Sequence, residues 1–150
     1  MPTRETYAAW RTHPNASGPT YMLLGIHDQF RKASAYLVEQ RELHAIAHVF
    51  LPLAQTLHHH HHAEEAMLFP LVEKRTGVAP ERLQSDHDEL TDAIDAVEAG
   101  VMARLGAGAL VPLVQRFHTV LVEHLDREED LVVPVLLELT PQQAWGLLEG

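Results

Sequence analysis

The chain carries one pattern of histidines and acidic residues twice, and this duplication constrains the fold more than any other feature. Each half contains a His-Asp pair, a connection, and then His-x-x-x-Glu-Glu followed by a proline in the same register. In the first half these residues are His27, Asp28, His60, Glu64, Glu65 and Pro70. In the second half they are His87, Asp88, His124, Glu128, Glu129 and Pro134. Such a repeat predicts two helical hairpins of matching pattern, related by an approximate two-fold axis.

Apolar residues recur at helical spacing along most of the chain, whereas alternating strand patterns are scarce. We expect helices over about 18–40, 42–75, 80–105 and 110–138, and a short C-terminal helix over about 141–148. Pro52, Pro70 and Pro134 lie inside these segments and should kink or end them. Four long helices with short connections predict an all-α, antiparallel up-down-up-down four-helix bundle, with its core at about 18–138.

Length and composition indicate a single domain that spans residues 1–150, because no linker or shift in composition divides the chain. The absence of cysteine excludes a disulfide-linked partner, thiolate metal sites and cysteine nucleophiles. The formal net charge of −10 argues against nucleic acid as a partner. The chain lacks both a long apolar stretch and a secretory signal, so we expect a cytoplasmic protein with no membrane partner.

The repeated histidines and glutamates point to a metal site. Residues i and i+4 share a helix face, so His60 with Glu64, and the matching pair in the second half, each present two donor groups together. These residues also fall on apolar stripes, and burying a carboxylate there costs on the order of several kcal/mol unless it is paired or metal-bound. The candidate metal ligands are His27, His60, Glu64, His87, His124 and Glu128.

The run His58–His62 requires an argument about register, because His61 with Glu65 would be an equally good pair in isolation. The second half favours His60, since a shift by one residue places Leu125 at the position of His61 and leucine cannot bind a metal. We therefore expect the other histidines of the run to be solvated, or at most to support a ligand. Supporting or alternative ligands are Glu65, Glu129 and His61. His44 and His48 form a separate pair without an assigned role.

The chemical types of the candidate ligands limit which metals fit the site. Four imidazoles and two carboxylates without a thiolate suit iron, manganese or zinc better than copper or calcium. If Glu64 and Glu128 bridge two ions, each ion receives two histidines and two carboxylate oxygens. An octahedral ion has roughly six positions, so an oxo or hydroxo bridge leaves about one open position on each. We expect two metal ions that bind a small diatomic or peroxide ligand, and the donor set alone leaves iron, manganese and zinc open.

The paired His-Asp and His-x-x-x-Glu-Glu…Pro elements resemble those of the hemerythrin-like HHE cation-binding domain over nearly the whole chain. Leu68-Phe69-Pro70 is a closer match to that family than Val133-Pro134. The resemblance implies a four-helix bundle with a non-haem di-iron centre, held by the six candidate ligands. The invertebrate oxygen carriers of the family resemble this chain less, because they have a second histidine where this chain has Thr91.

Three functions are compatible with these observations. The first is a di-iron protein that binds or senses oxygen, nitric oxide or iron. The second is an oxidoreductase with catalase-like or peroxidase-like activity, and the third is a module in which zinc or manganese only stabilises the bundle. Because Thr91 removes an imidazole, we expect a symmetric, open pair of irons that consumes peroxide rather than storing oxygen reversibly.

Overall fold

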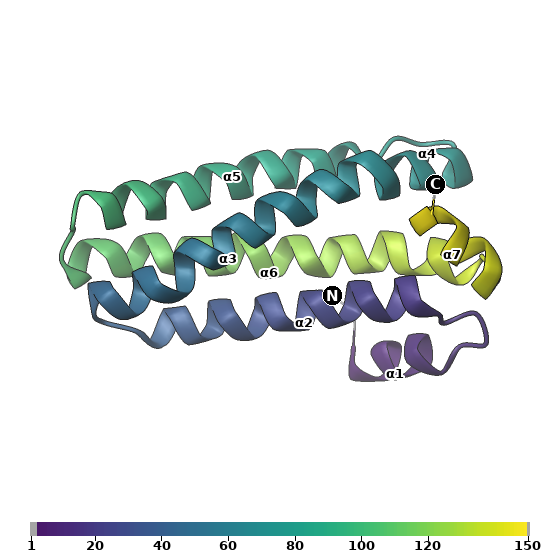
Figure 1. Cartoon of the computed structure of the whole chain (residues 1–150), viewed down its shortest axis with the longest axis horizontal. Helices are drawn as coiled ribbons and strands as arrows, with labels where there is room; N and C mark the ends of the chain where they lie inside the picture. Colours follow the sequence, from purple (N-terminus) through teal and green to yellow (C-terminus); the bar gives the residue numbers. More distant parts are fainter. Residues whose placement is uncertain (1–2, 150) are drawn as a thin grey trace.

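A computed structural model describes residues 3–149, and within this range the chain forms helices and no strand. The long helices α2, α3, α5 and α6 lie side by side as a bundle (Figure 1), and none of the described helices is long and apolar enough to cross a membrane. The elements are α1 (Arg4–Thr12), α2 (Gly18–Glu39), α3 (Leu43–Ala63), the π-helical segment η1 (Glu64–Leu68), α4 (Phe69–Thr76), α5 (Glu81–Met102), α6 (Ala107–Leu137) and α7 (Pro141–Glu149).

The chain runs back and forth along the bundle. Short loops join α2 to α3 and α5 to α6 at one end, and α4 to α5 at the other (Figure 1). The turn after α4 begins at Gly77, whose φ of +76° lies in the left-handed region that glycine adopts without strain. The all-helical architecture expected from the apolar periodicity is confirmed.

Two apolar clusters fill the bundle. The larger one includes Phe50 and Phe117, whose rings meet edge to face with centroids 5.2 Å apart. The smaller one, at the other end, includes Leu24 and Val132. Each buried side chain of this kind stabilises the fold by roughly 1.5–3 kcal/mol. Between the two clusters, each of the long helices contributes histidine or glutamate instead of an apolar residue.

The prediction of one continuous α-helix over 42–75 is wrong, because the middle of this segment is not α-helical. The structure divides this segment into α3, η1 and α4, and the N–H of Phe69 donates to the carbonyl of Glu64 in the i→i−5 bond of a π-helix. The wide turn lies just before Pro70, which has no N–H to donate and needs space for its ring. Pro52 and Pro134 lie inside α3 and α6 and end neither helix.

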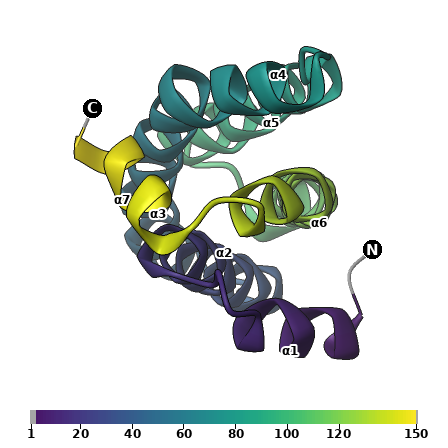
Figure 2. The ribbon, with the colours of Figure 1, turned by 90° about the vertical axis from the view of Figure 1, so that its right-hand side faces the viewer.

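Two short helices flank the bundle. Helix α1 was not expected from the sequence; it begins after Thr3, whose hydroxyl accepts a hydrogen bond from the N–H of Thr6. Figures 1 and 2 show α1 alongside α2. Helix α7 matches the short C-terminal helix that the sequence predicts. Trp145 of α7 lies so close to Gly18 that a larger residue there would collide with its ring.

Candidate metal centre

The six candidate ligands converge in the layer between the two apolar clusters. His27 comes from α2, His60 from α3, Glu64 from η1 and His87 from α5, while α6 contributes two residues. All except the half-buried His60 are buried, and their donor atoms fall into two adjacent groups. The repeat thus identifies six side chains that the fold brings together.

The first group contains His27, His60, Glu64 and Glu128, with donor atoms that all lie within 4.8 Å of one another. The Nε2 atoms of His27 and His60 are 3.2 Å apart. Oε1 of Glu128 lies 3.1 Å from Nε2 of His27, and Oε1 of Glu64 lies 3.3 Å from Nε2 of His60. These atoms surround a space in which one cation could contact all of them.

The second group contains His61, Glu64, His87 and His124, again with donor atoms within 4.8 Å of one another. The Nε2 atoms of His87 and His124 are 3.1 Å apart. Oε2 of Glu128 lies 3.0 Å from Nε2 of His124, whereas its other oxygen faces the first group. Glu64 and Glu128 therefore lie between the two groups and can serve both.

His61 does not lie where the register argument placed it. The expectation that its side chain is solvated is wrong, because it is 6% exposed and its ring stacks on that of His87 with centroids 4.0 Å apart. Its place in the second group agrees with the alternative that His61 supports or replaces a ligand. Consecutive residues diverge by about 100° around a helix, so His60 and His61 can face neighbouring groups in a site wide enough for both. At the matching position of α6, Leu125 packs in the apolar core.

Outer carboxylates hold three of the histidine rings in position. Nδ1 of His27 donates to Glu129 at 2.9 Å, and Nδ1 of His87 donates to Glu65 at 2.9 Å. Nδ1 of His124 lies 3.3 Å from Asp86. A proton on Nδ1 leaves Nε2 of a neutral ring with a free lone pair, and each of these Nε2 atoms faces the site. Glu65 and Glu129 thus lie where supporting residues were expected.

Asp86 has no counterpart in the repeat, because the first half has Ile26 at that position. The aspartate of the repeated His-Asp pair lies elsewhere: Asp28 forms an ion pair with Arg11 at 3.0 Å, and Asp88 is exposed. Sequence reasoning therefore missed Asp86, and the only available signal was its position directly before a candidate ligand.

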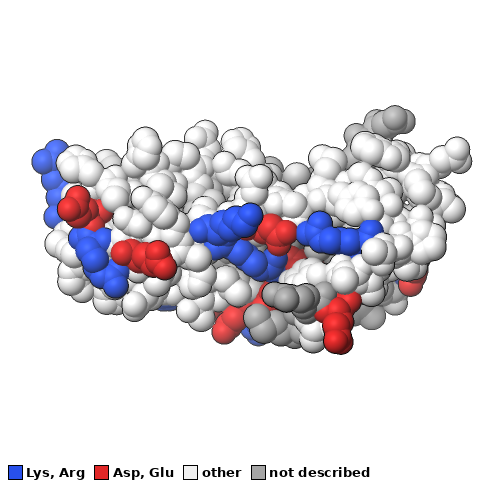
Figure 3. Space-filling view, turned by 90° about the horizontal axis from the view of Figure 1, so that it is seen from below, with Lys and Arg blue, Asp and Glu red and all other residues white. Residues whose placement is uncertain are grey.

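Cationic and phenolic side chains contact the outer carboxylates. Arg31 approaches Glu129 to 2.8 Å and Asp126 to 2.9 Å, and the Tyr7 hydroxyl donates to Glu129 at 2.6 Å. Arg127 contacts both oxygens of Asp86 at 2.8 Å. Figure 3 views the molecule from the side of α1 and α2, where lysine and arginine alternate with acidic residues. These contacts balance the outer charge of the site.

The two inner carboxylates have no arginine, lysine or tyrosine partner among the described residues, and only histidines lie within ion-pair distance of them. None of the four oxygens of Glu64 and Glu128 makes a hydrogen bond of acceptable geometry with a described residue, although all four are buried. Burial and the nearby Glu128 carboxylate raise the pKa of Glu64 well above its ordinary value. Burial also opposes ionisation of Glu128, but Glu64 and the neighbouring histidines outweigh it and keep the pKa of Glu128 low.

The histidine pKa values diverge for the same reasons. Burial lowers the pKa of His27, but the carboxylates of Glu128 and Glu129 outweigh this effect and raise it to about 9. Burial and the proximity of His27 lower the pKa of His60 to about 4. Strongly shifted pKa values in a cluster of donor groups are typical of functional sites.

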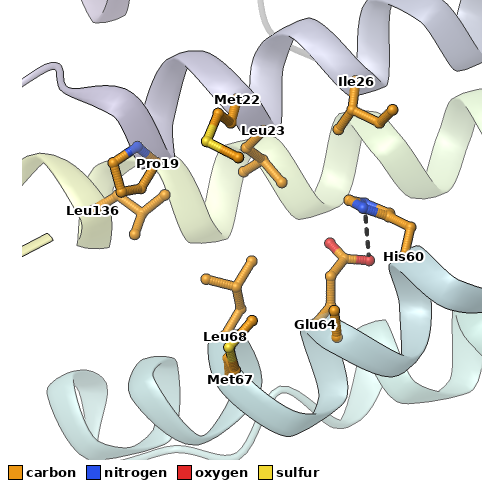
Figure 4. A pocket seen from close by; sticks show the side chains of 10 residues that line it. Pro19, Met22, Leu23, Ile26, His60, Glu64, Met67, Leu68 and Leu136 are labelled. Atoms are coloured by element: carbon orange, nitrogen blue, oxygen red, sulfur yellow. Dashed lines mark ion pairs between the residues drawn. The ribbon is translucent and has the colours of Figure 1, made fainter. Parts of the chain in front are cut away.

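An apolar pocket of about 310 Å³ opens beside the first group (Figure 4). His60 and Glu64, with Nε2 and Oε1 3.3 Å apart, lie together at one end of it. The pocket is lined by Pro19, Met22, Leu23, Ile26, His60, Ala63, Glu64, Met67, Leu68 and Leu136. It gives the candidate metal centre an apolar approach on the side of His60.

Comparison with known proteins agrees with a cation site. Residues 18–136 match the family model of the hemerythrin HHE cation binding domain, a range that runs from the start of α2 almost to the end of α6. No curated protein and no solved structure matches the chain.

Proposed function

The chain belongs to the hemerythrin HHE cation-binding family, and we propose that it is a non-haem di-iron protein that binds or reacts with small ligands such as dioxygen, peroxide or nitric oxide. In this proposal the helices form an antiparallel up-down-up-down four-helix bundle around two iron ions. Membership of the family implies cation binding, and the proposal concerns the identity and number of the cations and their ligands.

One observation carries the proposal: four buried carboxylate oxygens lie between two groups of imidazoles without a hydrogen bond from the described residues. Burying an uncompensated carboxylate costs on the order of several kcal/mol. Two cations would offset this cost, because Glu64 and Glu128 each face both groups. No described arginine or lysine forms an ion pair with either residue. Only histidines of the two groups lie within ion-pair distance of them, and bound cations would take the place of the protons that these histidines carry in the metal-free protein.

The donor atoms suit iron, and the two groups contain different numbers of histidines. Imidazole and carboxylate without thiolate match iron, manganese and zinc. Besides the shared glutamates, one group offers His61, His87 and His124, whereas the other offers His27 and His60. When bound, an iron pair supplies redox chemistry and open coordination positions for a small ligand. The group with fewer histidines adjoins the apolar pocket, so we place the open side there.

Because the two groups differ in their number of histidines, the argument from Thr91 for peroxide consumption no longer holds. Thr91 was expected to leave both ions with two histidines, but His61 offers the imidazole that position 91 lacks. Binding of a small ligand therefore comes first in our proposal. A peroxide-consuming oxidoreductase is the alternative within the same di-iron chemistry.

A zinc or manganese module is a second candidate, favoured by one specific feature. The group of His61, Glu64, His87 and His124 supplies three imidazoles and one carboxylate, which alone would complete a four-coordinate zinc site. In that case the first group would contribute little to binding.

Metal analysis of the purified protein, together with its absorption spectrum, tests the proposal. We expect about two iron ions per chain and a charge-transfer band that changes on addition of oxygen, peroxide or nitric oxide. One zinc ion per chain and a spectrum that no small ligand alters would replace the di-iron proposal by the zinc module.

A further inference from the structure

Helix α3 carries histidines that take no part in the metal centre. His60 and His61 face the two donor groups, whereas the remaining histidines of the helix are exposed. These residues are His44, His48, His58, His59 and His62. Imidazole is the commonest metal ligand among side chains and suits divalent transition metals. The outer face of α3 therefore holds ligands that the buried centre does not use.

Two pairs of these histidines have the spacing of a chelating site. His44 and His48, like His58 and His62, are four residues apart on α3, so the Cβ atoms of each pair lie about 5–6 Å apart on one face. Two histidines at this spacing on a helix bind the zinc ion of metalloproteases. Each exposed pair can therefore hold a divalent cation by two nitrogens, with water at the other coordination positions.

The pair of His58 and His62 continues into a carboxylate. Glu65 follows His62 by three residues, almost one helical turn, so the two side chains are neighbours. Burial opposes ionisation of Glu65, but hydrogen bonds from His87 and Gln84 and the proximity of His87 and His62 lower its pKa. Both hydrogen bonds go to Oε1, which leaves Oε2 for a cation that His62 also contacts.

Glu65 connects this surface to the metal centre. Its Oε1 lies 2.9 Å from Nδ1 of His87, whose Nε2 faces the second group. Glu65 also lines a surface hollow of about 310 Å³ together with Glu73 and Glu81, and no lysine or arginine is among the lining residues of this hollow. Carboxylates gathered in this way raise the local concentration of cations. A cation bound by His62 and Glu65 is separated from the second group by one imidazole ring.

The pair of His44 and His48 has no such continuation. The positions one turn after His48 are Leu51 and Pro52, which offer no ligand. His48 also lies about 20 Å from His62 along the helix, at a rise of about 1.5 Å per residue. This pair is therefore a matched control, with the same chemistry and spacing on the same helix.

We propose that His58 and His62 form a labile surface site that captures a divalent transition-metal cation, and that Glu65 passes this cation from His62 towards the second group. The capture site depends only on the exposed histidines of α3, whereas its role in delivery rests on the two-metal centre of the proposed function. Because two protein ligands hold the captured ion, it exchanges faster than the ions of the buried centre.

The test uses Co²⁺ as the probe, because the absorption spectrum of this ion depends on its ligands. His58→Gln with His62→Gln removes the capture site, and His44→Gln with His48→Gln removes the control pair. All four positions are exposed, so neither double variant should disturb the fold. Stopped-flow absorption follows the uptake of limiting Co²⁺ by the full chain after its metal has been removed. Equilibrium dialysis counts the rapidly exchanging Co²⁺ that the metal-loaded protein binds in addition to the ions of the centre.

We expect uptake to slow by about tenfold when His58 and His62 are replaced, which is the lower end of the effect of local charge on association rates. Uptake by the control variant should match that of the parent protein. The metal-loaded control variant should also still bind a rapidly exchanging Co²⁺, because it retains the capture site.

Equal uptake rates in the two double variants would overturn the proposal, as would a metal-loaded control variant that binds no rapidly exchanging Co²⁺. The final metal content separates this failure from that of the proposed function. Two ions per chain in every protein, reached at equal rates, reject the capture site alone. A parent protein that never retains two ions rejects the proposed function, and the count of rapidly exchanging ions then still decides whether His58 and His62 bind a cation.

Discussion

Glu129 on α6 accepts a hydrogen bond of 2.9 Å from Nδ1 of His27 on α2, and so connects a buried candidate ligand to the edge of the molecule. The same carboxylate accepts from Tyr7 and Arg31. Tyr7 of α1, a helix that packs outside the bundle, thus helps to hold the carboxylate that orients the ring of His27, which makes the properties of the metal centre depend in part on α1.

Replacing Glu129 by glutamine should weaken metal binding. The amide is about as large as the carboxylate but carries no charge, so the hydrogen bond from His27 weakens and its Nε2 becomes a poorer ligand. Loss of such a partner typically costs about 10–100-fold in metal affinity. Competition with a chelator of known affinity measures the change. Glu138→Gln, at an exposed position near the end of α6, should leave the affinity unchanged; equal affinities in the two variants would contradict this role.

His61→Ala should lose one of the two metals, whereas His62→Ala should lose none. His61 is buried against His87 in the second group, and its neighbour His62 is exposed. Metal content per chain after removal of loosely bound ions distinguishes the variants. Two metals per chain in both variants would show that His61 is not a required metal ligand and only supports one.

Thr91→His should restore the second metal in the His61→Ala background. Position 91 lies one turn after His87 on the same face of α5, so an imidazole there is placed to replace the one that His61→Ala removes. Full metal content in the double variant, compared with His61→Ala alone, is the expected result. Failure of this rescue in a folded protein would indicate that the backbone of α5 is too far away.

Part of this site could be predicted from the sequence, because helical spacing alone places residues such as His60 and Glu64 on one face. Symmetry between the halves identified six donors but gave the wrong surroundings for His61. Among residues 3–149 a π-helical turn occurs only in the first half, as η1, although Pro134 occupies the position in α6 that corresponds to Pro70. Proline alone therefore does not predict the wide turn.

Long-range contacts explain the remaining differences. Helix α1 is too short for its periodicity to stand out, so the contact from Tyr7 to Glu129 could not be expected. Asp86 reaches His124 and Arg127 on another helix, a relationship that depends on how α5 packs on α6.

The stability of the metal-free protein should fall as the pH rises from about 6.5 to 9. The pKa of His27 and that of His87 are both about 9 in the folded protein because neighbouring carboxylates outweigh burial, compared with about 6.5 in the unfolded chain. Their contribution is therefore complete below pH ~6.5 and is lost as the pH rises through about 9. His60, with a pKa lowered to about 4 by burial and by His27, acts in the opposite direction below pH ~6.5.

Thermal unfolding across this pH range, with and without metal, provides the measurement. The metal-loaded protein should instead lose stability as the pH falls below about 6, because protons compete with the metal for the same nitrogens. Chelation should lower Tm at every pH at which metal is bound. Identical thermal unfolding curves for the metal-loaded and metal-free protein, with metal removal verified, would contradict the claim that these side chains bind a cation.

Glu64→Gln should abolish metal-dependent stabilisation without destabilising the metal-free fold. Burial and Glu128 already raise the pKa of Glu64, so a neutral amide replaces a group that is costly to ionise there. Chemical denaturation with and without metal measures both effects. A variant that still gains stability from metal would show that Glu64 is not shared between the two groups.

Anomalous diffraction from iron-loaded crystals tests the central claim most directly, because it locates each metal independently of activity. We predict two peaks per chain, one among His27, His60, Glu64 and Glu128 and the other among His61, Glu64, His87 and His124. A single peak, or peaks only at the exposed histidines of the His58–His62 run, would contradict a shared two-metal centre.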